Sequence, residues 1–211
     1  MADQLSVHRP YAEASQQREA DLFGMYIFLV TEIMLFGGLL ATAYVIRVMY
    51  AQEAVAAAKH LKLWLGGFNT AALLTSSLFV ALAVVVARQG ERHRTVLRLA
   101  LAAGLGVLFL FIKCFEYLQE YREGLMPFPR PSSPLAQPGE HLFMNLYLVA
   151  TSLHALHLAL GIGLVLGLVW RIGRGSTPLP QRSITVEVVG LYWHLVDVVW
   201  VFIYPVFYLA R

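Results

Sequence analysis

Five apolar runs, each long enough to cross a lipid bilayer, constrain this chain more than any other feature of its sequence. A membrane-spanning helix needs about 20 predominantly apolar residues, and a soluble core seldom contains runs of that length. The runs cover residues 22–46, 63–87, 96–117, 142–170 and 188–210, and the second contains no charged residue. The sequence therefore predicts an all-α integral membrane bundle of five transmembrane helices.

The composition and the remaining segments agree with a single membrane domain. Of the 211 residues 58% are hydrophobic and 14% are charged, whereas about a quarter of a soluble domain is charged. Residues 1–21 are polar and have neither the apolar core nor the cleavage site of a signal peptide, so we expect a retained tail. Residues 22–211 then form the five-helix domain. Its longest connection contains MPFPRPSSPLAQP (126–138), which we expect to be extended because proline interrupts helices.

Basic residues predict the orientation of the bundle. The N-terminal tail and the segments joining the second run to the third and the fourth to the fifth contain nine arginines, against six arginines and lysines on the opposite side. By the positive-inside rule the N-terminus is cytoplasmic and the C-terminus lies outside. The net charge of +3 is spread over short loops, so the sequence does not predict nucleic-acid binding.

The sequence carries none of the familiar catalytic motifs. It has one cysteine, Cys114, which excludes an internal disulfide and a metal site built from several thiolates. It contains no glycine-rich phosphate loop, no GxSxG and no HExxH. The residues that require an explanation are instead the ionisable groups inside the apolar runs, because such groups are costly in a bilayer.

Four of these groups are expected at similar depth. Glu32 lies ten residues into the first run, which places it roughly 15 Å along a helix. Asp197 lies nine residues into the fifth run, which crosses in the same direction, and His154 and His157 lie near the middle of the fourth. These two histidines are three residues apart and should share a helix face. We therefore predict a buried polar layer near the middle of the membrane.

The fifth run adds two members to this cluster and leaves several roles open. Glu187, His194 and Asp197 follow i, i+7 and i+10, a spacing that forms one stripe along a helix. His194 and Asp197 could be a structural hydrogen-bonded pair. Glu32 could be a protonated acid bonded to a neighbouring helix, because burial disfavours the charged form, or it could carry protons. His154 and His194 could be axial haem ligands on facing helices, although no further ligands accompany them.

Two other patterns predict interfacial and packing features. Lys113 and Glu116 lie three residues apart near the end of the third run, which suggests an interfacial pair in which the lysine extends toward water. Small residues repeat every four positions along the fourth run, which is the pattern of closely packed membrane helices. They are Ala155, Ala159, Gly163 and Gly167.

Several segments together resemble a known family. GLYWHLVDVVWVFIYPVFYL (190–209) resembles the last helix of subunit III of the haem–copper oxidases, and GMYIFLVTEIMLFGG (24–38) resembles the family helix with a buried glutamate. FEYLQEYREG (115–124) is similar to the family's EY-containing helix end, and ATSLHALHLALG (150–161) resembles the helix with paired histidines. The matches occur in the same order as in the family, and together they extend over residues 22–210. The resemblance maps the buried polar cluster onto Glu32, His154, His157, Glu187, His194 and Asp197.

The resemblance also has a departure. Larger members of the family have seven spans, and the chain lacks the two that come first. In those members the missing pair forms one wall of a lipid-filled cleft. Arg171 matches a family arginine at a helix end near the lipids, and it is a candidate for binding a phospholipid.

The resemblance implies an accessory role in the plasma membrane of a bacterium. Subunit III carries no haem, copper or other metal, has no catalytic residue, and packs beside the catalytic haem–copper subunit I and the copper-carrying subunit II. It protects the active site from inactivation during turnover and supports proton uptake, while the complex reduces oxygen to water and pumps protons. The six residues of the polar cluster would then be structural and electrostatic.

Other interpretations remain at this point. Quinol oxidases and a subunit associated with nitric oxide reductases also have five-span members with similar signatures, and the electron donor can be cytochrome c or quinol. Outside the family, a proton-coupled transporter could use Glu32 and Asp197. Transporters of that kind often contain inverted repeats and broken helices, which this sequence does not show.

Overall fold

The computed structural model describes residues 14–125, 135 and 137–209, and all regular secondary structure within these ranges is helical. Five of the six helices are long and apolar enough to cross a membrane, which confirms the predicted all-α bundle of five spans. The helices are α1 (Ala14–Met49), α2 (Ala51–Ala58), α3 (Leu63–Arg88), α4 (Arg92–Arg122), α5 (Pro138–Gly173) and α6 (Ser183–Tyr208).

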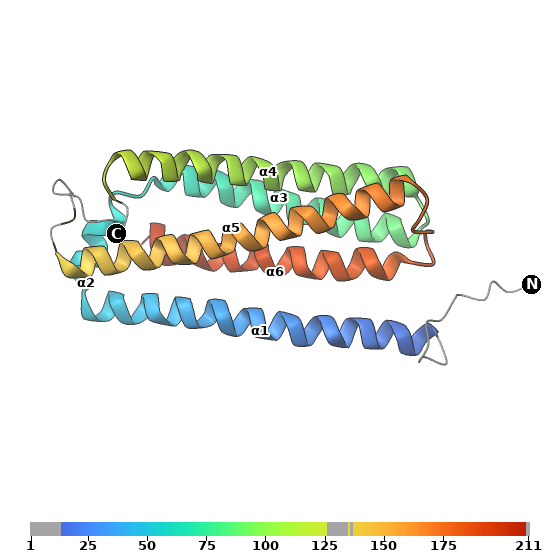
Figure 1. Ribbon diagram of the computed structural model, residues 1–211, viewed down its shortest axis with the longest axis horizontal. Helices are drawn as coiled ribbons and strands as arrows, with labels where there is room; N and C mark the ends of the chain where they lie inside the picture. The colour runs from blue at the N-terminus through green and yellow to red at the C-terminus, as the bar shows by residue number, and fades with distance from the viewer. Residues whose placement is uncertain (1–13, 126–134, 136, 210–211) are drawn as a thin grey trace, which may run out of the picture.

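Four of the long helices, α3 to α6, form an antiparallel bundle, and α1 lies along one side of it (Figure 1). α3 and α4 form a hairpin with the most extensive contact in the molecule, while α1 contacts α5 and α6. The short α2 packs against α5 at one end. The start of α1 and the end of α6 lie at opposite ends of the bundle, as five crossings require. Which end faces the cytoplasm remains a prediction from the charge distribution.

Glycines end three of the long helices in the same way. Gly90, Gly124 and Gly175 have φ of 80°, 77° and 79° and follow α3, α4 and α5. At each end the next residue's N–H bonds back to a carbonyl in the last turn of the helix, as between Leu125 and Glu120. A C-cap of this kind requires one residue in the left-handed backbone conformation, which glycine adopts at little cost.

Four of the predicted spans are shorter than the helices that contain them, while the fifth, 188–210, begins inside α6 and runs past the last residue of that helix, Tyr208. α1 begins at Ala14, inside the predicted tail 1–21, and α4 extends from Arg92 to Arg122 rather than over 96–117. Hydropathy detects only the apolar part of a helix, and these helices continue through polar residues beyond it. The sequence also gave no indication of α2, which has only 8 residues. The rest of the predicted tail and residues 126–134 of the proline-rich segment lie outside the described residues.

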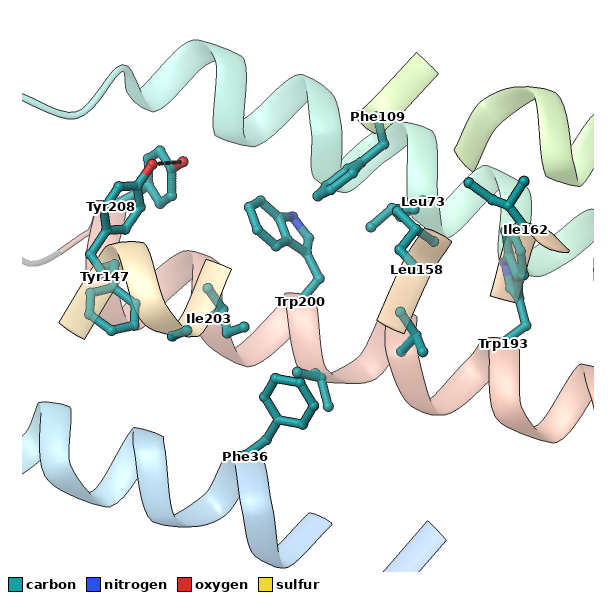
Figure 2. Close-up of a cluster of buried hydrophobic side chains, with 14 of the residues drawn as sticks. Phe36, Leu73, Phe109, Tyr147, Leu158, Ile162, Trp193, Trp200, Ile203 and Tyr208 are labelled. Carbon is teal, nitrogen blue, oxygen red and sulfur yellow. Dashed lines mark hydrogen bonds between the residues drawn. The ribbon is translucent and has the colours of Figure 1, made fainter. Parts of the chain in front are cut away.

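Large aromatic side chains lie in the core where α4, α5 and α6 meet, among buried aliphatic ones (Figure 2). Trp193 and Trp200 point inward from α6, and the Phe109 ring meets that of Trp200 edge-on at 4.7 Å between centroids. Glycine makes room for these rings, because a Cβ on Gly106 would lie 2.9 Å from Trp193 and one on Gly161 would lie 3.3 Å from Tyr192.

The predicted small-residue stripe of α5 does not face the bundle. Ala159, Gly163 and Gly167 are exposed, and a Cβ on either glycine would meet nothing within 4 Å. Close packing occurs instead at Gly161, which lies on another face of the same helix. Periodicity had identified a set of residues that share a face, but it could not show which face of α5 turns inward.

Candidate functional site

Glu32 and His157 form a contact between α1 and α5. Glu32 Oε2 lies 2.9 Å from His157 Nε2, and each side chain is 13% exposed. The His157 ring also meets Phe36 edge-on at 5.2 Å between centroids. The buried glutamate and one of the paired histidines therefore lie next to each other where α1 meets α5.

The hydrogen bonds of His157 limit where its protons can be. Its Nδ1 lies 2.8 Å from the Leu153 carbonyl oxygen, which can only accept, so Nδ1 carries a hydrogen. The contact between Nε2 and Glu32 Oε2 is close, but its angles fall outside hydrogen-bond geometry. The two side chains are therefore in close electrostatic contact without a well-formed hydrogen bond between them.

His154 occupies a different environment from its neighbour three residues along. It is completely buried and lies between two aromatic rings. The centroid of the His154 ring is 5.5 Å from that of Phe109 and 5.1 Å from that of Trp200. Neither of its nitrogens has a hydrogen-bond partner among the described residues. His154 faces the aromatic core, whereas His157 faces α1, so the two do not act as one pair.

His194 and Asp197 of α6 both lie beside Ser77 of α3. The Ser77 hydroxyl is 2.6 Å from His194 Nδ1. Asp197 is buried and lies close enough to Ser77 to interact with it electrostatically. Neither Asp197 oxygen, however, makes a hydrogen bond of good geometry within the described parts of the chain. His194 therefore bonds a serine of another helix, and the predicted direct pair with Asp197 is wrong.

Glu187 belongs to a separate group at one end of the bundle. Its Oε2 lies 2.8 Å from Arg88 of α3 and 3.3 Å from Arg18 of α1. Both arginines are more than half exposed, so the group lies at the surface of the bundle. The pairing connects α1 to α3 and α6, although it is not part of a mid-membrane layer.

The largest polar cluster joins α4, α5 and α6 near the end where α4 and α6 terminate. Lys113 Nζ donates to Glu116 at 2.9 Å, to the Tyr147 hydroxyl at 3.0 Å and to the Tyr208 hydroxyl at 2.9 Å. Tyr208 donates to Glu116 at 2.8 Å, and Tyr147 donates to Glu120 at 2.9 Å. Figure 2 shows the two tyrosines with their hydroxyls together.

This cluster corrects the prediction for Lys113 and Glu116. Each side chain is only 2% exposed, so the lysine does not extend to the membrane surface. The physical reason is that three acceptors lie within reach inside the bundle, and a buried ammonium is tolerated when all its hydrogens are bonded. Glu120, Tyr147 and Tyr208 were not among the residues predicted from the sequence.

A signal for one of these residues was present in the sequence. Lys113, Glu116 and Glu120 follow i, i+3 and i+7, which places all three on one helix face. The two tyrosines come from other helices, and nothing in their local sequence distinguishes them from interfacial aromatics.

The remaining predicted residues do not form a metal site. In the part of the chain that the structure describes, no three His, Cys, Asp or Glu side chains are grouped so as to hold a metal ion. His154 and His194 contact different partners, an aromatic core and Ser77, and do not face each other across a shared space. Arg171 is exposed in the last turn of α5. The neighbouring Arg174 lies 4.3 Å from the centre of the Trp170 ring.

Comparisons with known proteins extend over almost the whole chain. A sequence model of the family described as cytochrome c oxidase subunit III matches residues 13–210. Cytochrome c oxidase subunit 3 of Thermostichus vulcanus is 28% identical over 196 residues, which cover 93% of this chain and 90% of that protein. Quinol oxidase subunit 3 of Bacillus spizizenii is 30% identical over 201 residues, with 95% and 92% covered. Cytochrome bo(3) ubiquinol oxidase subunit 3 of Pseudomonas aeruginosa is 26% identical over 210 residues, with 99% and 94% covered.

Proposed function

Since the chain belongs to the cytochrome c oxidase subunit III family, we propose that it is the non-redox subunit III of a haem–copper terminal oxidase, with cytochrome c as the donor. The observation that carries this proposal is the family match over residues 13–210, which includes all five spans. The chain is an integral membrane protein and an accessory subunit of such a complex. Reduction of oxygen and proton pumping belong to the complex.

The geometry of the polar groups supports a structural and electrostatic role. Glu32, His157 and Glu187 each pair with a group on another helix of this chain, and His194 bonds Ser77 in the same way. Within a bilayer, contacts of this kind fix the packing of helices. His154 and Asp197 complete the set as buried groups at the contacts of α6 with its neighbours.

The partners and cofactors follow from this assignment. A haem–copper subunit I and a copper-carrying subunit II would hold the redox groups, and this chain would bind none. It would stabilise the complex during turnover and support proton uptake, with its N-terminus in the cytoplasm of a bacterium and its C-terminus outside. We assign no part in catalysis to its residues.

A quinol oxidase is the second candidate, because relatives named as quinol oxidase subunit 3 match the chain as fully as those named cytochrome c oxidase subunit 3. The chain itself does not distinguish the two donors. A proton-coupled transporter using Glu32 and Asp197 has less support, since Glu32 is engaged with His157 and Asp197 is buried against α3.

Arg171 remains a proposed contact for a phospholipid headgroup. It is exposed at the end of α5, next to the exposed Trp170, and such pairs of basic and aromatic residues are common at membrane interfaces. Native mass spectrometry of the complex should detect less retained phospholipid in Arg171→Gln than in Arg94→Gln, a matched change at an exposed arginine in the first turn of α4. Equal retention would remove Arg171 from the proposal.

The direct test is gentle purification of the native complex through a tag on this chain. Haem absorbance, larger co-purifying subunits and oxygen consumption that responds to reduced cytochrome c support the proposal. Oxygen consumption that responds only to quinol would assign the chain to a quinol oxidase. A colourless, solitary protein under the same conditions would overturn both assignments and leave proton-coupled transport as the function to test.

A further inference from the structure

The polar cluster near the end of α4, here called the Lys113 cluster, contains one buried cation and two buried carboxyl groups. It is formed by Lys113, Glu116, Glu120, Tyr147 and Tyr208. We propose that Glu120 binds an exchangeable proton there, which makes the cluster a proton-binding site between α4, α5 and α6. This inference does not depend on the proposed function, because it follows from the contacts of the chain itself.

The first argument is an inventory of hydrogens. An ammonium group has three donors, and those of Lys113 go to Glu116, Tyr147 and Tyr208. Each phenol has one hydrogen, and these go to Glu116 from Tyr208 and to Glu120 from Tyr147. The five groups therefore use every hydrogen that they carry with both glutamates ionised.

The two carboxyl groups accept different numbers of these hydrogen bonds. Both oxygens of Glu116 accept a hydrogen bond, one from the Lys113 ammonium and one from Tyr208. Glu120 accepts one bond, at Oε1, from a neutral phenol, and its Oε2 is buried without a partner among the described residues. A buried carboxylate needs a paired charge or several donors. Glu116 satisfies this requirement and Glu120 does not.

The second argument is the balance of charge. Lys113 and Glu116 together are neutral, so an ionised Glu120 would leave one uncompensated charge in a cluster that is almost completely buried. The charged groups facing this end from α4 itself and from α3 are accessible to water: Glu123 and Arg122 are exposed, and exposed Lys62 bonds Gln119. From the first turn of α5 come Glu140 and His141, both partly exposed.

α6 adds no compensating charge, since its last turn contains no basic residue and contributes Tyr208 to the cluster. In the described parts of the chain, therefore, no second cation is buried beside Glu120. A proton on Glu120 gives the cluster its neutrality. This proton can exchange, because Glu120 lies in the last turn of α4 and is followed by the exposed Tyr121 and Arg122.

The test is infrared spectroscopy of the whole complex purified through this chain, reading the carbonyl-stretching band of protonated carboxylic acids. Glu120→Gln should remove the intensity of one acid from that band, and the wild-type band should shift in D2O. The matched control Glu123→Gln, an exposed glutamate at the end of the same helix, should leave the band unchanged.

Lys113→Met provides a second and opposite prediction. Without the ammonium, Glu116 also needs a proton to be neutral, so the band should gain the intensity of one acid. Tyr147→Phe removes the hydroxyl that donates to Glu120 and accepts one of the three hydrogen bonds of Lys113. It leaves the ammonium and both carboxyl groups in place, so it should shift the position of the band without changing its intensity. This last variant keeps the test available if the lysine variant does not assemble.

Two results would overturn the proposal. One is an unchanged band in Glu120→Gln, which would mean that Glu120 is ionised in the wild type. The other is a band whose position is the same in Tyr147→Phe and in the wild type, which would mean that the protonated acid lies elsewhere. Loss of band intensity in Glu123→Gln would likewise place the proton outside the cluster.

Discussion

The contact between Glu32 and His157 offers a direct measurement of how α1 is held to the bundle. In Glu32→Leu the carboxyl group is replaced by an apolar side chain of similar size, and His157 Nε2 loses its partner. In His157→Phe the ring contact with Phe36 is retained, but Glu32 loses its partner. Each single substitution leaves one largely buried polar group unpaired, and the double substitution leaves none.

The expected magnitudes follow from that difference. A buried polar group left without its partner costs about 1–3 kcal/mol, whereas replacing both partners with apolar groups is nearly neutral. Polar contacts between membrane helices average about 0.6 kcal/mol and reach about 1.7 kcal/mol. Because both side chains are 13% exposed, we expect each single variant to lose about 1 kcal/mol, a factor of about five in the unfolding equilibrium. The double variant should lose less than the sum of the two.

The assay is a double-mutant cycle on the chain in mixed micelles, with unfolding by SDS followed through the fluorescence of the buried Trp193 and Trp200. Thr42→Ala is the matched control on α1, since the Thr42 hydroxyl bonds only the Gly38 carbonyl of its own helix. Strict additivity of the Glu32 and His157 substitutions would refute the reasoning, because it would mean that the two groups do not interact.

Three further predictions test other parts of the bundle. Gly106→Leu should destabilise the fold by about 1–3 kcal/mol, since even a Cβ there would lie 2.9 Å from Trp193, while Gly163→Leu on the open face of α5 should have little effect in the same unfolding assay. Asp197→Ala should loosen assembly or shorten the active life of the complex and leave its haem spectrum nearly unchanged, and loss of haem on purification would contradict this. Glu187→Gln should cost under about 1 kcal/mol, and this cost should shrink as salt is raised, because the arginines it pairs with are more than half exposed.

The number and order of the spans could be predicted from the sequence because hydropathy is a local property. The C-terminal ends of α3, α4 and α5 could also have been predicted from the sequence. RQGE, REGL and GRGS each place a glycine just after a last turn or C-cap that contains an arginine. That pattern is typical of a helix C-terminus. The predicted spans 63–87, 96–117 and 142–170 stopped short of these helix ends because they followed the loss of apolar character instead of the glycine signals.

The partners of the polar residues could not be predicted in the same way. His154 and His157 differ by about 60° around the helix axis, given 3.6 residues per turn. That difference turns one toward the aromatic core and the other toward α1. A sequence shows which residues lie near one another on a helix, but the rotation of each helix depends on all its neighbours. The same uncertainty made the stripe of Gly163 and Gly167 appear to be a packing face.

The polar groups of this chain are distributed over several separate helix contacts. Glu32 and His157 join α1 to α5, Ser77 and His194 join α3 to α6, and the Lys113 cluster joins α4, α5 and α6. In a bilayer the outside of a bundle is as apolar as its core, so burial of apolar surface does not select one rotation of a helix. Polar groups do select it, because they have partners in one arrangement only. A set of separate contacts also confines the effect of losing any one of them to its own pair of helices, which a single mid-membrane layer would not do.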